Sequence, residues 1–74
     1  MTDEEIIEIL AYEVHNNWMT WSKEIVRTER ISEERRDRWE NSWVPYEDLP
    51  EDVKEQDRVF ARKMLIKLKE TGKL

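Results

Sequence analysis

The fold of this chain is decided by residues 44–50, Val44-Pro45-Tyr46-Glu47-Asp48-Leu49-Pro50, in which two prolines lie five positions apart. A proline has no backbone N–H and its ring clashes with the preceding helical turn, and it pushes the residue before it toward an extended conformation. The sequence therefore predicts an ordered, non-helical connection across Val44–Leu49. Pro50 suits the first position of a following helix, with Glu51 and Asp52 in the first turn.

The segment after this loop has the pattern of one long helix. Its apolar residues recur at three- and four-residue steps, which places them on one helical face. That face is predicted to hold Val53, Phe60, Ala61, Met64, Leu65 and Leu68. Gly72 is expected to stop the helix, because glycine readily adopts the left-handed conformation that closes many helices.

A second long helix is predicted at the start of the chain. Thr2 and Glu5 have the spacing of a capping box, so this helix should start at Thr2. Apolar residues at helical steps continue its buried face to about Val26, with Asn16 and Asn17 as a candidate weak point.

A short third helix is predicted between the two long ones, from Glu33 to about Ser42. Ser32 is the expected N-cap, and acidic residues fill the first turn. Its only large apolar residues are Trp39 and Trp43, one helical step apart. A helix this polar needs those two anchors to hold it in place.

Length and composition set the fold class. A chain of 74 residues makes one domain at most. It has no cysteine, and the lone His15 cannot build a zinc site, so we expect neither disulfide nor metal nor cofactor. The acidic residues at 47–52 lack the spacing of a calcium loop. Residues 1–74 are predicted to form a single all-α domain, a compact three-helix fold with an ordered proline-containing loop.

Charge narrows the classes of partner. The net charge of −5 argues against non-specific nucleic-acid binding, which depends on neutralising phosphates with Lys and Arg. No apolar run approaches the length of a membrane span, and the N-terminus opens with acids instead of the basic residues of a signal peptide. We therefore expect a cytoplasmic protein without a membrane partner. Residues 1–17 carry five acids and no Lys or Arg, whereas residues 58–74 carry six bases and one acid, so the two ends are expected to lie together.

Several of these residues match a known pattern. Residues 43–58 read Trp-Val-Pro-Tyr-Glu-Asp-Leu-Pro-Glu-Asp-Val-Lys-Glu-Gln-Asp-Arg, and upstream lie Leu10-Ala11, His15, Trp18 and Lys23. This arrangement resembles the ryanodine-receptor (RyR) domain family over about residues 10–72, and most of all its short stand-alone bacterial and phage forms. The resemblance implies a compact helical fold, no catalytic activity, and a role as an interaction or ligand-sensing module for adenine nucleotides or nucleotide-derived ligands.

The chain departs from the family pattern in one place. A Gly-Trp-x-Tyr-Gly stretch usually follows the first helix in the family, whereas here the corresponding residues 27–36 contain four arginines and no glycine. A family binding surface built from that stretch is therefore in question for this chain.

Four residues are assigned structural roles. His15 is interpreted as a half-buried core residue that hydrogen-bonds the proline loop, with ligand contact as the alternative. Asp57 falls on the apolar stripe of the last helix, where an unpaired charge costs several kcal/mol, so an Arg or a loop backbone N–H is its expected partner. Pro45 and Pro50 shape the loop.

The candidate ligand-binding residues are aromatic and basic. If a nucleotide binds, Trp18, Trp43 and Tyr46 would stack on its base, and Lys23 and Arg58 would reach a phosphate. The alternative is that the tryptophans form the core, although so many rings should leave at least one partly exposed. The Arg27–Arg38 segment is either a solvated face whose arginines pair with neighbouring acids or a phosphate clamp.

These observations lead to two functional hypotheses from different classes. The leading hypothesis is a non-enzymatic module that captures a small anionic adenine or cyclic nucleotide as a sensor or sponge. The alternative is a protein–protein interaction or oligomerisation domain without a small-molecule ligand. A short chain without disulfides or metal and with exposed rings is also predicted to self-associate.

Overall fold

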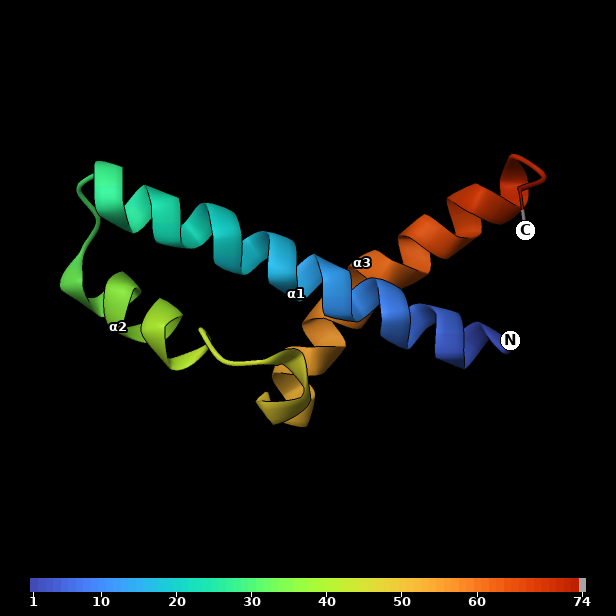
Figure 1. The fold of residues 1–74 in the computed structure, drawn as a ribbon, viewed down its shortest axis with the longest axis horizontal. Helices are drawn as coiled ribbons and strands as arrows, with labels where there is room; N and C mark the ends of the chain where they lie inside the picture. Colours follow the sequence, from blue (N-terminus) through green and yellow to red (C-terminus); the bar gives the residue numbers. More distant parts are fainter. Residues whose placement is uncertain (74) are drawn as a thin grey trace.

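The computed structural model describes residues 1–73 and shows an all-α chain, which confirms the predicted fold class. Figure 1 shows the order of the elements, and no strand occurs among the described residues. They are α1 (Asp3–Thr28), α2 (Glu33–Asn41), a short 3-10 turn η1 (Tyr46–Asp48) and α3 (Glu51–Glu70).

Helix α1 begins where the sequence predicts. The Thr2 hydroxyl accepts from the Glu5 backbone N–H at 3.2 Å, and the Glu5 carboxylate accepts from the Thr2 N–H at 3.1 Å, which completes the capping box. The helix then runs unbroken through Asn16 and Asn17 for 26 residues, so the candidate weak point is not a break. It ends at Thr28, two residues beyond the prediction.

Helix α2 and the proline loop differ from the prediction in detail. The Ser32 hydroxyl caps α2 as expected, accepting from the Arg35 N–H at 3.2 Å. The connection is free of α-helix, but η1 adds one 3-10 turn that the prediction of a wholly non-helical loop missed. Pro50 is the N-cap of α3 and not its first residue, because its ψ of 153° is still extended.

The end of α3 has a regular glycine stop. Gly72 has a φ of +76°, in the left-handed region predicted for it. Its N–H donates to the Lys69 carbonyl at 3.1 Å, and the Lys73 N–H donates to the Leu68 carbonyl at 3.0 Å. These two hydrogen bonds are those of a Schellman motif.

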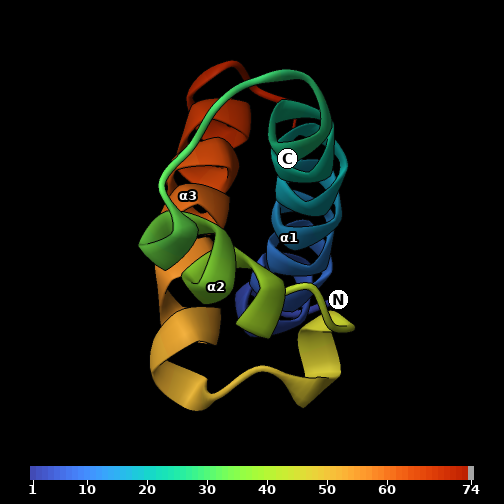
Figure 2. The same ribbon diagram turned by 90° about the vertical axis from the view of Figure 1, so that its left-hand side faces the viewer.

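The core lies where α1 crosses α3. Figure 2 shows the two helices side by side with α2 across one end. Ala11 and Ala61 are fully buried at the crossing, where their small side chains let the helices approach, and Tyr46 and Leu49 of the loop close the cluster at 5 % exposure. The predicted stripe of α3 is only partly buried. Leu65 is 4 % exposed, whereas Phe60 and Met64 lie beside the contact line and remain about half exposed.

The domain is more elongated than the compact fold expected from the sequence. Its extents are 43 × 23 × 14 Å and its radius of gyration is 14.3 Å, against about 11 Å for a compact domain of this length. The reason is that α2 packs at one end instead of covering the α1–α3 pair (Figure 2). None of the helices within residues 1–73 has the length and apolar character needed to cross a membrane.

Candidate functional site

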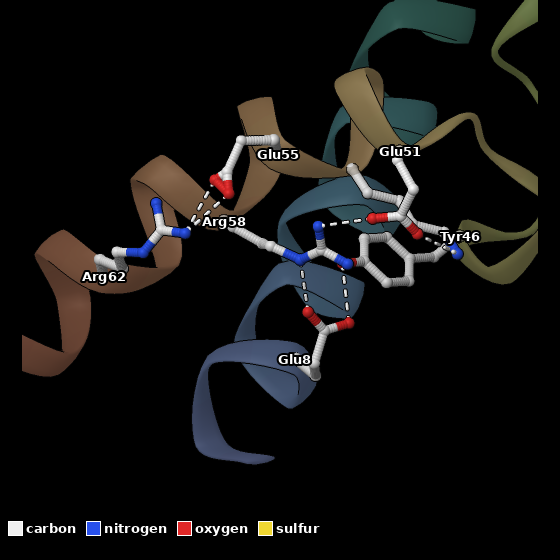
Figure 3. Close-up of polar contacts among 7 residues, drawn as sticks. Glu8, Tyr46, Glu51, Glu55, Arg58 and Arg62 are labelled. Carbon is white, nitrogen blue, oxygen red and sulfur yellow. Dashed lines mark hydrogen bonds and ion pairs between the residues drawn. The ribbon is translucent and has the colours of Figure 1, made fainter. Parts of the chain in front are cut away.

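Tyr46 and Arg58, two of the predicted ligand-binding residues, belong to one polar network. Arg58 donates through Nε to Glu8 and through Nη1 to Glu51 at 3.0 Å, and the Tyr46 hydroxyl donates to the other Glu8 oxygen at 3.0 Å (Figure 3). The network joins α1, η1 and α3. Together with the Lys69–Asp3 ion pair at 2.7 Å, it brings the acidic start of the chain against the basic end, as predicted.

The network explains the titration behaviour of its members. The Arg58 guanidinium lowers the pKa of the Glu8 carboxyl. Burial and the hydrogen bond to Glu8 raise the pKa of Tyr46 to about 12. Because two carboxylates of its own chain already compensate Arg58, the geometry favours a structural role for this arginine over contact with a phosphate.

Lys23 and Trp43 form a second, separate group. The Lys23 ammonium lies 5.7 Å from the centre of the Trp43 ring, within the range of a cation–π contact. The Trp43 indole N–H donates to the Ser22 hydroxyl at 3.0 Å, and Ser22 is fully buried. Trp43 therefore ties the end of α2 to α1.

Trp18 lies in a third group, an aromatic cluster at the α1–α2 junction. Trp18, Trp21 and Trp39 meet edge to face in all three pairs, with ring centres 5.9–6.5 Å apart. His15 stacks on Trp18 at 5.8 Å. Trp21 is 44 % exposed, which confirms that one ring stays partly accessible. The five predicted ligand-binding residues thus fall into three groups.

His15 and Asp57 form a buried pair next to this cluster. His15 is 2 % exposed, and its Nε2–H donates to the Val44 carbonyl at 2.6 Å, at the edge of the proline loop. Its Nδ1 lies 3.8 Å from Asp57 Oδ2, which has no hydrogen-bond partner among the described residues. The expectation of an Arg or loop N–H partner for Asp57 is therefore wrong, because Arg58 points to Glu8 and the histidine faces Asp57 instead. Burial raises the pKa of Asp57.

A cavity of about 510 Å³ opens where α2 meets the α1–α3 pair. Trp18 and Trp39 supply aromatic walls, Arg38 supplies a positive charge, and Asp57 supplies an acceptor. The other lining residues are His15, Ser42, Val53, Gln56 and Phe60. This volume lies in the range of about 300–1,000 Å³ that is usual for small-molecule sites.

Two other hollows suit an anion less well. One of about 430 Å³ beside Tyr12 and Tyr46 is lined by three glutamates and only one lysine. Another of about 440 Å³ along α1 and α3 has apolar walls with two acids and no Lys or Arg. Of these three hollows among the described residues, the α2 cavity is the one that combines aromatic rings with an arginine.

The arginines of the 27–38 segment are mostly unpaired. Arg27 pairs with Glu24 within α1, but within residues 1–73 no ion pair involves Arg30, Arg35, Arg36 or Arg38. These four arginines are exposed, as expected for a solvated face, but the pairing with neighbouring acids is not seen among the described residues. The charge of Arg38 is free to act at the cavity that it lines.

The sequence singled out Trp18 but missed its cavity partners. In the sequence, Arg38 stands out only as a member of the charged segment and Trp39 only as one of the four tryptophans. Trp39 is the only large apolar residue within α2, which marks it as an anchor of this helix. Adjacent side chains on a helix point about 100° apart, so this anchor alone did not indicate that Arg38 lines the cavity. Among the described residues, no cluster of three or more His, Asp or Glu side chains is arranged to hold a metal ion.

Comparisons of the chain with protein-family models, with curated proteins and with solved structures found no match.

Proposed function

We propose that this chain captures a small anionic nucleotide in the α2 cavity, without catalysing a reaction. The observation that carries the proposal is the meeting of Trp18, Trp39 and the unpaired Arg38 in one hollow of about 510 Å³. The resemblance of residues 43–58 to RyR domains supports the same ligand class. Of the five ligand-binding residues predicted from the sequence, the proposed site contains only Trp18. Four other residues of the matching pattern also line it, namely His15, Val53, Gln56 and Asp57.

The aromatic walls suit a planar base. The Trp18 and Trp39 rings stand at 81° to each other, so they form a corner in which a base can stack on one ring and meet the edge of the other. A base stacked on an aromatic side chain contributes about 1–3 kcal/mol. Asp57 lines the same cavity with a side chain that is 16 % exposed, so its carboxylate offers an acceptor for an exocyclic amino group, while its Oδ2 is buried against His15.

The charge at the cavity suits a phosphate. A guanidinium fork matches two phosphate oxygens, and Arg38 needs to break no ion pair to offer it. Helix α2 has no buried residue, so the arginine is presented by an element that can adjust to a ligand.

Binding without chemistry fits the arrangement of the polar groups. Ser42, His15 and Asp57 all line the cavity, which invites comparison with a catalytic triad. In a triad the histidine nitrogen remote from the aspartate receives the serine proton. Here that nitrogen, Nε2, donates to the Val44 carbonyl and cannot serve as the base for Ser42.

Calorimetric titration with AMP, cyclic AMP and adenosine tests the proposal. Arg38→Ala should weaken AMP and cyclic AMP by about 10- to 100-fold, as expected for a lost charge-assisted hydrogen bond. The same variant should leave adenosine unchanged. Trp39→Leu should weaken all three ligands. Arg35→Ala, on the same helix but outside the cavity, is the matched control.

The same titrations can refute the proposal. Equal losses for nucleotide and nucleoside in Arg38→Ala would remove the phosphate contact. Absence of binding by the wild-type chain to every phosphorylated purine and pyrimidine tested would remove the function. Arg58→Ala should lower the melting temperature and leave affinity intact, which separates the α2 cavity from the Glu8–Arg58 network.

A further inference from the structure

The α1–α3 pair has an open apolar groove on one face. Leu10 and Val14 of α1 and Phe60 and Met64 of α3 form its walls, and the hollow measures about 440 Å³. Phe60 is 54 % exposed and Met64 is 45 % exposed. Met64 lies beside the buried line of α3, and Phe60 lies between the groove and the α2 cavity, both of which it lines.

The groove lacks the second layer that a stable domain normally has. Domains are built from at least two packed layers around one core. In this chain the proline loop packs on the crossing of α1 and α3, and α2 packs only at one end (Figure 2). The groove face is therefore a single layer of two helices.

The charged residues that line the groove are Glu13 and Asp57, and the charges of the two flanking segments favour a second copy of the chain as its occupant. Residues 1–17 of α1 carry five acids and no base, and residues 58–73 carry six bases and one acid. These segments lie side by side in one chain, as the Asp3–Lys69 pair shows. A two-fold rotation about an axis along the helices places α1 of one copy on α3 of the other, so that an acidic segment faces a basic one twice.

We propose that this groove binds a second copy of the chain and forms a closed dimer with four long helices. Phe60 and Met64 of each copy fill the groove of the other, and the acidic part of α1 lies along the basic part of α3 in the partner. The groove shares Trp18, Asp57 and Phe60 with the α2 cavity, whereas Arg38 and Trp39 line only the α2 cavity. A substitution of Arg38 therefore tests the nucleotide site without altering the groove.

Sedimentation equilibrium over a dilution series tests the dimer. The wild-type chain should show a reversible monomer–dimer equilibrium. Met64→Glu should raise the dimer dissociation constant at least about tenfold, because it places a charge in the groove. Ile66→Glu is the matched control, since Ile66 is 56 % exposed on the opposite side of the same helix and should not change the constant. A dispersed NMR spectrum establishes that each variant is folded.

Disulfide trapping tests the orientation of the two copies. The chain has no cysteine, so each introduced thiol is unique. A mixture of Glu13→Cys and Lys63→Cys chains should trap mixed dimers in preference to either homodimer. The proposal is overturned if the wild-type chain stays monomeric at every concentration. It is also overturned if Ile66→Glu raises the dimer dissociation constant as much as Met64→Glu does. Preferential homodimers of Glu13→Cys would overturn the orientation. Arg38→Ala should leave the dimer unchanged, so failure here and failure of the nucleotide site are distinguishable.

Discussion

The two long helices and the short one are held by different kinds of contact. Helices α1 and α3 meet along a core in which Ala11, Ala61 and Leu65 are almost completely buried. Helix α2 has nine residues and no buried one, and it is attached through Trp39 and Trp43 at its end. The comparison teaches that continuous apolar packing fixes one part of this domain, whereas two aromatic anchors attach the other.

The difference assigns distinct tasks to the two regions. A packed helix pair opens only when most of the core is lost, whereas an element with few buried contacts opens locally at lower cost. The proposed ligand site lies between the two regions, with Trp18 on α1 and Arg38 and Trp39 on α2. A rigid wall and an adjustable wall together suit the capture of a ligand.

The largest loss of stability is expected from a substitution in the core between α1 and α3. Leu65→Ala should lower the free energy of unfolding by about 2–5 kcal/mol, because it removes buried methyl groups and leaves a cavity. That loss is a large part of the total for a chain this short. Ile66→Ala, one residue away and exposed, should change stability by no more than about 0.5 kcal/mol. Urea unfolding of both variants measures the contrast, and similar losses would mean that α3 does not pack on α1 through Leu65.

A smaller loss is expected from the network that clamps the same helices. Arg58→Ala should lower the free energy of unfolding by about 1–2 kcal/mol, less than a buried charged hydrogen bond would give because Glu8 is half exposed. Arg62→Ala removes a solvent-exposed pair with Glu55, drawn beside the network in Figure 3, and should cost less. Thermal unfolding at low salt measures the change in melting temperature for each variant. A larger decrease for Arg62→Ala than for Arg58→Ala would contradict the role of the Glu8–Arg58 network in holding the helices together.

Because of the same network, the domain should lose stability at alkaline pH. The folded pKa of Tyr46, about 12, lies above its ordinary value of 10.0. A group whose pKa is raised by folding stabilises the fold below its unfolded pKa, and that contribution disappears as pH rises from 10 to about 12. Tyr46→Phe should cost about 1 kcal/mol at neutral pH and converge with the wild type at high pH. Parallel unfolding curves at all pH values would show that the hydroxyl does not donate to Glu8.

In acid, the stability of the domain should change with pH in the opposite direction. The pKa of Glu8 is lowered by Arg58, so its contribution is complete above its ordinary value of 4.5 and disappears as pH falls through the lowered folded value. Glu8→Gln should therefore be less stable than the wild type at neutral pH, and the difference should shrink in acid. A constant difference down to pH 2, measured by urea unfolding, would argue against the pairing with Arg58.

The smallest global effect is expected in α2. Ser32→Ala removes the N-cap, which costs about 0.5–2 kcal/mol of local helix stability. Because α2 is only anchored, global unfolding should change by less than about 0.5 kcal/mol, whereas amide exchange in residues 35–41 should accelerate. Thr2→Ala, at the cap of α1, is the comparison. An equal change in exchange across all three helices would mean that α2 opens only with the whole domain.

Local rules in the sequence were sufficient for the elements. The Thr2 capping box, the Ser32 cap and the Gly72 stop depend on neighbouring residues alone, and all three appear as predicted. The helical period also identified α1 and α3. It could not decide which side of α3 meets α1, so the exposure of Phe60 and Met64 was missed.

The candidate site was harder to predict because it depends on contacts between distant residues. The partner of Asp57 is His15, 42 positions earlier in the chain, and nothing local to either residue indicates the pairing. The resemblance directed attention to Arg58, whose charge the structure compensates with Glu8 and Glu51. Arg38 reaches the cavity through the placement of α2, which follows from its tryptophan anchors.

The distribution of tryptophan in this fold has an optical consequence. All four tryptophans lie between residues 18 and 43, in the second half of α1 and in α2 and its end, and α3 has none. Intrinsic fluorescence therefore reports on the anchored end of the molecule, whereas far-ultraviolet ellipticity arises mainly from the 26 residues of α1 and the 20 of α3. The chain thus contains two built-in signals, one for each region, and release of α2 would change the colour of the emitted light before the helical signal is lost.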